Sequence, residues 1–272
     1  MHFKKSNHHQ STVFHEGEVP YITFKKLSEA GVTHGFSTRM GGVSEGVYAS
    51  MNLSYHRGDD KKAVDENFRR IGAAIGFDPE KLVFSNQIHK TDIHKVTEKD
   101  CGKVMTGMDG LVTNVKGVPM YTGYADCVPL FFYDPVKEVA AMAHSGWRGT
   151  VGRIGAKMVH VMEQEYGCHK ENIIAAIGPS ICKDCYEISE DVAQEFKKEF
   201  CECPWEEYLE DKGNGKYQLD LWKVNEIILL GAGILKEHLD VTDLCTCCNH
   251  KYLFSHRASH GKRGNLGAFI VL

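Results

Sequence analysis

The sequence predicts an α+β fold, with mixed β-sheets and flanking helices in a single layered domain. Of its 272 residues, 42% are apolar and 25% are charged, which is typical of a globular chain. Amphipathic helical segments interleave with short apolar runs, without the strict alternation that predicts a doubly wound parallel sheet. No repeat or Pro/Gly/Ser-rich linker divides the chain, so one continuous domain fits better than two.

Three segments have apolar residues at helical spacing. The first follows Asp60, and its apolar residues recur every three or four positions until Gly76. Residues 151–166 show the same spacing and are followed by Gly167. Residues 221–238 form the third predicted helix.

Short apolar runs bounded by turn residues lie between these helices. Their length and their content of β-branched residues favour buried strands. The predicted strands are residues 82–85, 110–113, 128–133, 138–144 and 173–177.

The N-terminal sequence has lysines but no apolar stretch behind them, which does not fit a signal peptide. We expect residues 1–18 to be a flexible segment, with His2, His8 and His9 in a solvated tail. No segment has the roughly 20 apolar residues that span a bilayer. We therefore predict a cytoplasmic protein without a membrane partner, whose ten cysteines are reduced. The formal net charge of −4 gives no reason to expect nucleic acid as a partner.

Three segments place a metal-binding residue type at the end of an apolar run. They carry His89, Cys127 and His144. Zinc binds imidazole nitrogen and thiolate, and catalytic zinc sites use three protein ligands and one open position. Their spacing alone does not predict a shared site, and an inert buried thiol or packing histidine is the alternative. Strand alternation would turn Asp126 away from Cys127, which favours a structural role for this carboxylate.

Seven ordered motifs carry a resemblance that covers nearly the whole chain. They are HGFSTRMGGVSEGVYASMNL (34–53), NQIH (86–89), MDGLVT (108–113), ADCVPLFFYD (125–134), AHSGWRGTVGRI (143–154), IGPSICKDCYEI (177–188) and LFSHR (253–257). In these motifs the chain resembles the laccase-domain family, also called multicopper polyphenol oxidoreductase-like and now regarded as purine nucleoside phosphorylases. The resemblance implies that residues 19–272 form one laccase-domain-like catalytic domain.

The resemblance also implies a zinc ion held by His89, Cys127 and His144. It implies phosphorolysis of adenosine, inosine and S-methyl-5'-thioadenosine to free base and ribose 1-phosphate, so the expected partners are a nucleoside and phosphate. Adenosine deaminase activity is implied as well, and a zinc that lowers the pKa of bound water to about 7 would suit it. Copper is the alternative metal, because relatives have been linked to copper-dependent oxidation of phenols.

Two arginines in these motifs are predicted to contact phosphate, because guanidinium forks bind it in a bidentate manner. Arg148 joins the three metal ligands as a predicted catalytic residue, with a structural ion pair as the alternative. Arg39 is predicted to bind phosphate, with a surface turn residue as the alternative. Further residues in the motifs are predicted to position the substrate, namely His34, Asn52, Gln87 and Asp109. For His34 a hydrogen-bonded packing histidine is the alternative.

The C-terminal region departs from the family pattern. Relatives close on Gly-Arg, whereas here Arg263 precedes Gly264, which puts a phosphate-binding role of this arginine in doubt. The cluster Cys245, Cys247 and Cys248 with His250 resembles a metal site in composition, but no second matched pair follows it.

The pair Cys182 and Cys185 has C-x-x-C spacing without a thioredoxin-like βαβ context. We interpret these residues as reduced structural thiols.

Three other functions remain open at this point. One is a copper-dependent polyphenol oxidase. Another is a metal-free hydrolase with Cys127 as nucleophile and His144 as base. The last is a non-catalytic partner protein in which the zinc is structural. The sequence does not predict the oligomeric state.

Overall fold

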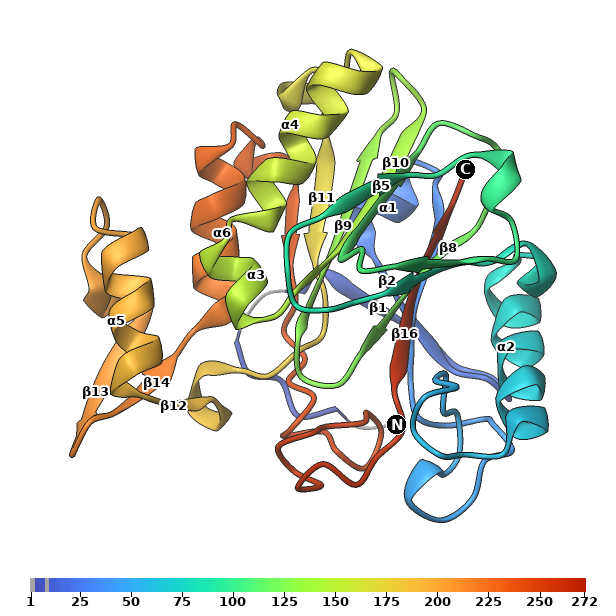
Figure 1. Cartoon of the computed structure of the whole chain (residues 1–272), viewed down its shortest axis with the longest axis horizontal. Helices are drawn as coiled ribbons and strands as arrows, with labels where there is room; N and C mark the ends of the chain where they lie inside the picture. The colour runs from blue at the N-terminus through green and yellow to red at the C-terminus, as the bar shows by residue number, and fades with distance from the viewer. Residues whose placement is uncertain (1–2, 8–9) are drawn as a thin grey trace.

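The computed structural model describes residues 3–7 and 10–272, so His2, His8 and His9 lie outside the described residues. The described residues form six α-helices in addition to three sheets (Figure 1). The helices are α1 (Lys25–Glu29), α2 (Lys61–Ile75), α3 (Trp147–Val151), α4 (Ile154–Tyr166), α5 (Glu190–Glu199) and α6 (Leu221–Gly231).

Two large mixed sheets make up most of the molecule. The seven-stranded sheet has the order β1 (Thr12–His15), β2 (Tyr21–Phe24), β3 (Thr33–Ser37), β16 (Leu266–Val271), β8 (Met120–Tyr124), β4 (Val83–Asn86) and β6 (Val104–Thr106). The six-stranded sheet has the order β15 (Leu239–Val241), β11 (Ile174–Ile177), β9 (Val128–Asp134), β10 (Val139–Ser145), β7 (Gly110–Thr113) and β5 (Ile93–Lys95). A smaller sheet of β12 (Glu187–Ser189), β14 (Lys216–Leu219) and β13 (Leu209–Gly213) projects with α5 from one side (Figure 1).

The two large sheets pack face to face, and helices cover their outer faces. Alternation along β9 turns Leu130 and Phe132 toward the core beneath α4 and α6, and Phe131 toward the layer between the sheets. On the far side, Phe68 of α2 packs on Tyr121 of the seven-stranded sheet. Helices α4 and α2 therefore lie on opposite sides of the paired sheets (Figure 1). This arrangement confirms the predicted α+β fold with mixed sheets and flanking helices in one layered domain.

The predicted helix after Asp60 is α2, and its ends have the predicted chemistry. The Asp60 side chain accepts a hydrogen bond from the backbone N–H of Lys62. Gly76 ends the helix with a φ of 98°, a left-handed conformation that glycine adopts without strain. The five predicted strands correspond to β4, β7, β9, β10 and β11 with shifts of one residue at their ends.

Two predicted helices are shorter than expected. The segment 151–166 is divided, because Arg153 has a φ of 54° between α3 and α4. The segment 221–238 is helical only to Gly231, and Gly233 has a φ of 99° that an α-helix cannot contain.

Part of the segment 1–18, for which we expected flexibility, belongs to the sheet, since β1 pairs with β2. The domain start at residue 19 stays a prediction. Within residues 3–7 and 10–272, no helix has the length and apolar character needed to cross a membrane.

Candidate metal centre and active site

The three predicted metal ligands meet where the chain passes from one large sheet to the other. His89 follows β4 of the seven-stranded sheet, and Cys127 lies in the turn that connects β8 to β9. His144 is the sixth residue of β10 and pairs with Pro129 of β9, which brings it next to this turn. One nitrogen or sulfur atom from each of the three residues lies within 4.8 Å of the others. Residues far apart in the sequence thus form one group of donors.

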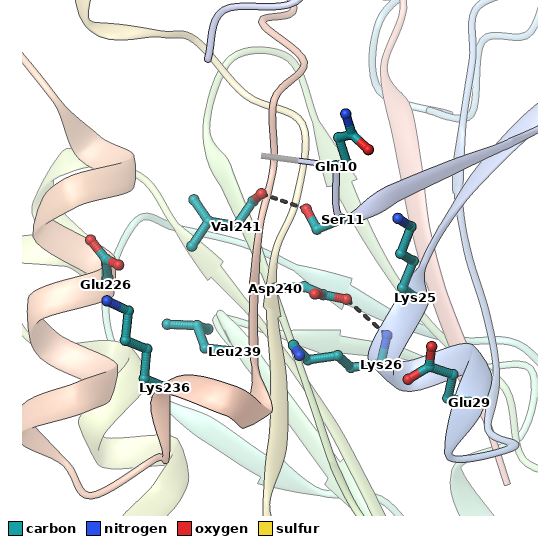
Figure 2. Close-up of a pocket in the computed structure, with 10 residues that line it drawn as sticks. All are labelled: Gln10, Ser11, Lys25, Lys26, Glu29, Glu226, Lys236, Leu239, Asp240 and Val241. Atoms are coloured by element: carbon teal, nitrogen blue, oxygen red, sulfur yellow. Dashed lines mark hydrogen bonds between the residues drawn. The ribbon is translucent and has the colours of Figure 1, made fainter. Parts of the chain in front are cut away.

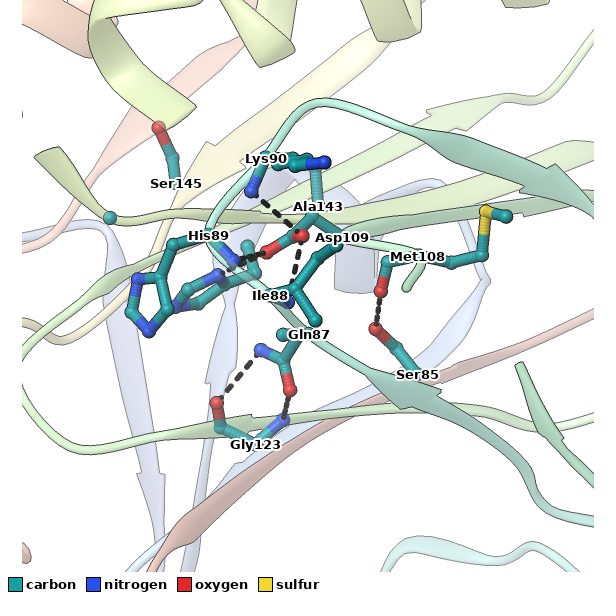
Figure 3. A network of polar contacts seen from close by, with 12 residues as sticks. Ser85, Gln87, Ile88, His89, Lys90, Met108, Asp109, Gly123, Ala143 and Ser145 are labelled. Carbon is teal, nitrogen blue, oxygen red and sulfur yellow. Dashed lines mark hydrogen bonds and ion pairs between the residues drawn. The ribbon is translucent and has the colours of Figure 1, made fainter. Parts of the chain in front are cut away.

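Asp109 contacts two of these three residues, and Figure 3 shows its bonds to the loop that carries His89. Its fully buried carboxylate accepts hydrogen bonds from the backbone N–H groups of Ile88 (3.0 Å), His89 (3.1 Å) and Lys90 (3.0 Å). The same carboxylate lies 2.8 Å from His144 Nδ1. His144 Nδ1 is therefore engaged, and Nε2 is the ring nitrogen left for a metal. A carboxylate that orients a ligand histidine in this way is a common feature of zinc sites.

The charges around His144 favour the protonated imidazole when no metal is bound. Burial lowers the pKa of this histidine, but the neighbouring Cys127 thiolate and the hydrogen bond to Asp109 outweigh it and raise the pKa to about 9. For His89, burial is the main cause that lowers the pKa, followed by repulsion from His144. The Asp109 carboxylate thus lies beside two imidazoles and a thiol that a bound metal would deprotonate, which suits a divalent cation.

The backbone leaves room for an ion beside the donor atoms. A Cβ added to Gly146 would lie 3.0 Å from His89 Nδ1 and 3.2 Å from Cys127 Sγ. His89 itself has a φ of 60°, and Asp126 has a φ of 84°. Left-handed non-glycine residues cost about 1–3 kcal/mol each and gather at functional sites. The donor set, the Asp109 contact and the space at Gly146 all fit a zinc ion.

A cavity of about 310 Å³ opens beside the donors. Its wall includes His89, Cys127 and the guanidinium of Arg148, whose carbon stacks 4.1 Å from the centre of the Trp147 ring. The other lining residues are Ile88, Asp126, Trp147, Ile181, Tyr186 and Leu221. The cavity wall combines aromatic rings, a positive charge and two of the three donors, so it suits a small polar ligand with a flat ring.

Another cavity, of about 370 Å³, lies between α1 and β15 (Figure 2). Two of its polar side chains are engaged within the protein, since Ser11 donates to the Val241 carbonyl and Asp240 accepts from the Lys26 backbone N–H. Neither a histidine nor a cysteine lines it. This cavity therefore has no group of metal ligands like the one beside the 310 Å³ cavity.

Two predicted substrate residues are engaged in holding the fold. The Arg39 guanidinium donates to the carbonyls of Ala49 and His250 and stacks on Phe254 at 4.5 Å. His34 is buried and its Nδ1 donates to the Val32 carbonyl, while Nε2 accepts from the backbone N–H of Phe24. Both ring nitrogens are thus occupied, as in the packing-histidine alternative.

The remaining predicted positioning residues tie loops to the sheet. Asn52 is fully buried, donates to Asp59 and accepts from the backbone N–H of Asn265. Gln87 forms two hydrogen bonds with the backbone of Gly123, of 2.9 and 3.1 Å, two residues before the donor His89 (Figure 3). Gln87 thereby fixes the loop that presents His89, which is a different role from contacting substrate.

Asp126 has the structural role that the sequence indicated, but for a different reason. It lies in the turn after β8 rather than in a strand. Its carboxylate accepts from the Thr246 hydroxyl at 2.6 Å and from the backbone N–H of Arg257 at 2.7 Å. These bonds attach the long C-terminal loop to the turn that carries Cys127.

The C-terminal loop contributes a group of positive charges that sequence reasoning missed. Burial and the charges of Arg263, Arg57 and Arg257 all lower the pKa of His256, against the opposing effect of Asp126. Arg263 is buried, and its Nε has no hydrogen-bond partner among the described residues. The order Arg263-Gly264 had cast doubt on this residue, and Arg57 carries no sequence signal. Only the fold brings these arginines together.

The structure brings four of the cysteines together. All ten cysteines are free, but Cys245 and Cys248 do have a matching pair, which precedes them in the chain. The sulfur atoms of Cys182, Cys185, Cys245 and Cys248 lie within 4.8 Å of one another. His250 is not in this group, and its Nδ1 bonds to the Cys247 carbonyl.

Comparison with known proteins shows which family the chain belongs to. The chain is 37% identical over 251 residues to a purine nucleoside phosphorylase, YlmD, of Geobacillus stearothermophilus, covering 89% of this chain and 90% of that protein. It is 32% identical over 248 residues to the adenosine deaminase RL5 of an unknown prokaryote, covering 88% and 93%. The crystal structure of YlmD from Geobacillus stearothermophilus superposes with a TM-score of 0.90 at 34% identity, covering 96% and 98% of the two chains. The model of the multi-copper polyphenol oxidoreductase laccase family matches residues 33–272, and the chain belongs to this family.

Proposed function

We propose that the protein is a zinc-dependent purine nucleoside phosphorylase that also deaminates adenosine. Its proposed nucleoside substrates are adenosine, inosine and S-methyl-5'-thioadenosine, which phosphate converts to free base and ribose 1-phosphate. The observation that carries the proposal is the convergence of His89, Cys127 and His144 beside a ligand-sized cavity, which His89 and Cys127 line. The names of the relatives, phosphorylases and an adenosine deaminase, support the same assignment.

His89, Cys127 and His144 would hold the zinc ion. A zinc bound there would supply a Lewis acid with one coordination position left for a reactant. Asp109 fixes the ring orientation of His144 and, through three backbone N–H groups, the loop of His89. Because the His144 imidazole and the backbone of His89 are held in place before substrate binds, little reorganisation is needed in the reaction.

Phosphorolysis places further demands on the chain. A phosphate oxygen forms a bond to C1' of the ribose while the bond from C1' to the purine nitrogen breaks, so the anionic nucleophile must be held beside the sugar. Arg148 lines the cavity, Arg263 lies 3.4 Å from His256 Nδ1, and the charges of Arg57 and Arg257 also act on this histidine. We assign phosphate binding to these arginines in place of Arg39. Their planar guanidinium groups suit bidentate contacts to phosphate.

Aromatic rings in the cavity wall would bind the purine. Tyr186 and Trp147 both line the cavity, and flat rings of this kind stack on a heterocyclic base. Burial raises the pKa of the Tyr186 phenol, so this side chain stays neutral and able to donate a hydrogen bond.

The test is incubation of the zinc-loaded protein with inosine and phosphate, followed by chromatography of the products. We expect equal amounts of hypoxanthine and ribose 1-phosphate, and neither without phosphate. The Cys127→Ala variant should lose the activity, whereas Cys201→Ala, at an exposed cysteine, should retain it. If wild-type protein releases no more hypoxanthine than Cys127→Ala, the phosphorylase assignment is wrong. Conversion of adenosine to inosine without phosphate tests the deaminase activity separately.

Metal content separates this proposal from the alternatives. Mass spectrometry of the purified protein should find zinc. Copper together with oxidation of a phenolic dye would favour the polyphenol oxidase. Absence of metal, with rapid alkylation of Cys127 by iodoacetamide, would favour the metal-free hydrolase, because a metal-bound thiolate reacts slowly.

A further inference from the structure

A second group of potential metal ligands lies outside the cavity. Cys182 and Cys185 follow β11, and Cys245 and Cys248 follow β15. Strands β11 and β15 are parallel neighbours, so their following loops leave the same end of the sheet. The two loops are joined by a bridge between Ser180 and Cys245. The topology thus brings two C-x-x-C pairs from distant parts of the sequence to one place.

The four sulfur atoms have the spacing of a closed tetrahedral site. All lie within 4.8 Å of one another, and Cys185 Sγ is 3.5 Å from Cys248 Sγ. With zinc–sulfur bonds of about 2.3 Å, the edge of a ZnS₄ tetrahedron is about 3.8 Å, which falls inside this range. Two disulfides would need sulfur pairs at about 2.05 Å, and all four cysteines are free.

Two backbone N–H groups point at the sulfur of Cys245. Its sulfur accepts hydrogen bonds from the N–H of Cys182 at 3.3 Å and of Cys248 at 3.4 Å. Amide donors directed at a sulfur stabilise negative charge there and orient a ligand for metal binding. Cys182 and Cys245 are buried, whereas Cys185 and Cys248 are half-buried. The group is therefore nearly closed to solvent, as structural zinc sites are.

We propose that Cys182, Cys185, Cys245 and Cys248 bind a structural zinc ion, separate from the metal held by His89, Cys127 and His144. No position would be left open for a reactant, because four thiolates complete the tetrahedron.

This zinc ion would fix one wall of the catalytic cavity. Thr246, between the two C-terminal cysteines, donates to Asp126, the neighbour of Cys127. On the other loop, the backbone N–H of Ile181 donates to the Asp126 carbonyl at 3.0 Å, and both Ile181 and Tyr186 line the cavity. Joining the loops by a metal would hold both segments against the turn that carries Cys127.

The experiment counts zinc in the full-length protein purified from zinc-supplemented medium. Wild type should contain one zinc more per chain than Cys185→Ser and than Cys248→Ser. Cys247 lies in the same loop outside the set of four close sulfurs, so Cys247→Ser is the matched control and should bind as much zinc as wild type. Equal zinc in wild type, Cys185→Ser and Cys248→Ser would overturn the proposal.

Cys127→Ala provides a second measurement that does not require a cysteine of the group to be removed. Exchange of its remaining metal for Co²⁺ should give the intense visible and near-ultraviolet absorption of a tetrahedral thiolate site. Loss of the catalytic metal leaves this signal in place, so failure of the proposed phosphorylase function and failure of the second site remain distinguishable. The second site is refuted if the Cys127→Ala protein contains no metal. It is also refuted if mass spectrometry shows that the four cysteines are joined as disulfides.

Discussion

Replacement of Asp109 by asparagine is the sharpest test of how the metal ligands are held. The carboxylate accepts four hydrogen bonds, two on each oxygen, from three backbone N–H groups and from His144. Burial raises the pKa of Asp109, but the hydrogen bonds from His144 and the Lys90 N–H outweigh it and keep the pKa below its ordinary value. The carboxylate is therefore charged at neutral pH.

Asparagine has the same shape but only one acceptor oxygen, so at most two of the four bonds survive. The side-chain NH2 group of the asparagine cannot accept a hydrogen bond, and it would face the two N–H donors that lose their partner. Loss of two hydrogen bonds to a charged group costs about 1.5–3 kcal/mol each, or about 3–6 kcal/mol in total. For a chain of this size the unfolding midpoint should fall by roughly 6–24 °C. Loss of the partner that orients a ligand histidine should also weaken zinc binding by about 10–100-fold.

Two assays separate these effects for Asp109→Asn. Thermal unfolding in the presence of EDTA measures stability without metal, and competition with a chromogenic chelator measures zinc affinity. Asp100→Asn is the control, because Asp100 bonds to Thr97 and His94, away from the donor group. The control should leave zinc affinity unchanged. An Asp109→Asn protein with wild-type stability and wild-type zinc affinity would show that this carboxylate does not organise the site.

Three further predictions concern the cavity and the core. Gly146→Ala should lower zinc affinity by about tenfold or more, measured with the same chelator, because the added Cβ would contact the ligand atoms of His89 and Cys127. Arg148→Gln should raise KM for phosphate in steady-state kinetics by about tenfold. This change corresponds to the loss of one charge-assisted contact worth about 1.4 kcal/mol. Burial lowers the pKa of His34 from 6.5 to about 4. As the pH falls, His34 is therefore protonated in the unfolded chain before it is protonated in the folded chain. The free energy of unfolding that is present above pH 6.5 should consequently fall by up to about 3 kcal/mol toward pH 4.

Controls for these predictions come from the same chain. Gly149→Ala is matched to Gly146→Ala, since its added Cβ would approach the His144 carbonyl rather than a donor atom. Arg39→Gln should reduce stability without raising KM for phosphate, and an increase equal to that of Arg148→Gln would contradict our assignment. Urea unfolding of His34→Gln should show a flatter loss of stability between pH 6.5 and 4 than wild type. An unchanged pH dependence would show that burial of His34 is not its cause.

Local signals predicted the parts of the fold that depend on local chemistry. The cap at Asp60 and the left-handed glycine at Gly76 determine the ends of α2, and both are visible in the sequence. Apolar runs predicted β9 and β10 because both faces of these strands are buried. The break at Arg153 was not predicted, because a left-handed arginine has no sequence signature. Edge strands such as β1, with intermediate burial, lack a comparable apolar signal.

The site was predictable only where a motif marked it. Family motifs brought His89, Cys127 and His144 to attention, although nothing in their spacing indicated a contact. The roles of Arg39 and His34 depend on which backbone groups lie beside them, which a sequence does not reveal. The pairing of two C-x-x-C segments was missed for the same reason, since it depends on β11 and β15 being neighbours.

The position of β16 has a consequence for biosynthesis. This strand occupies the middle of the seven-stranded sheet, between β3 and β8, so Phe36 pairs with Ala268. During translation, β3 and β8 would both leave the ribosome long before the strand that joins them. Until Val271 is made, each would expose an unpaired edge to other chains. We therefore expect the nascent polypeptide to depend on chaperones that bind open β-edges until β16 has been synthesised.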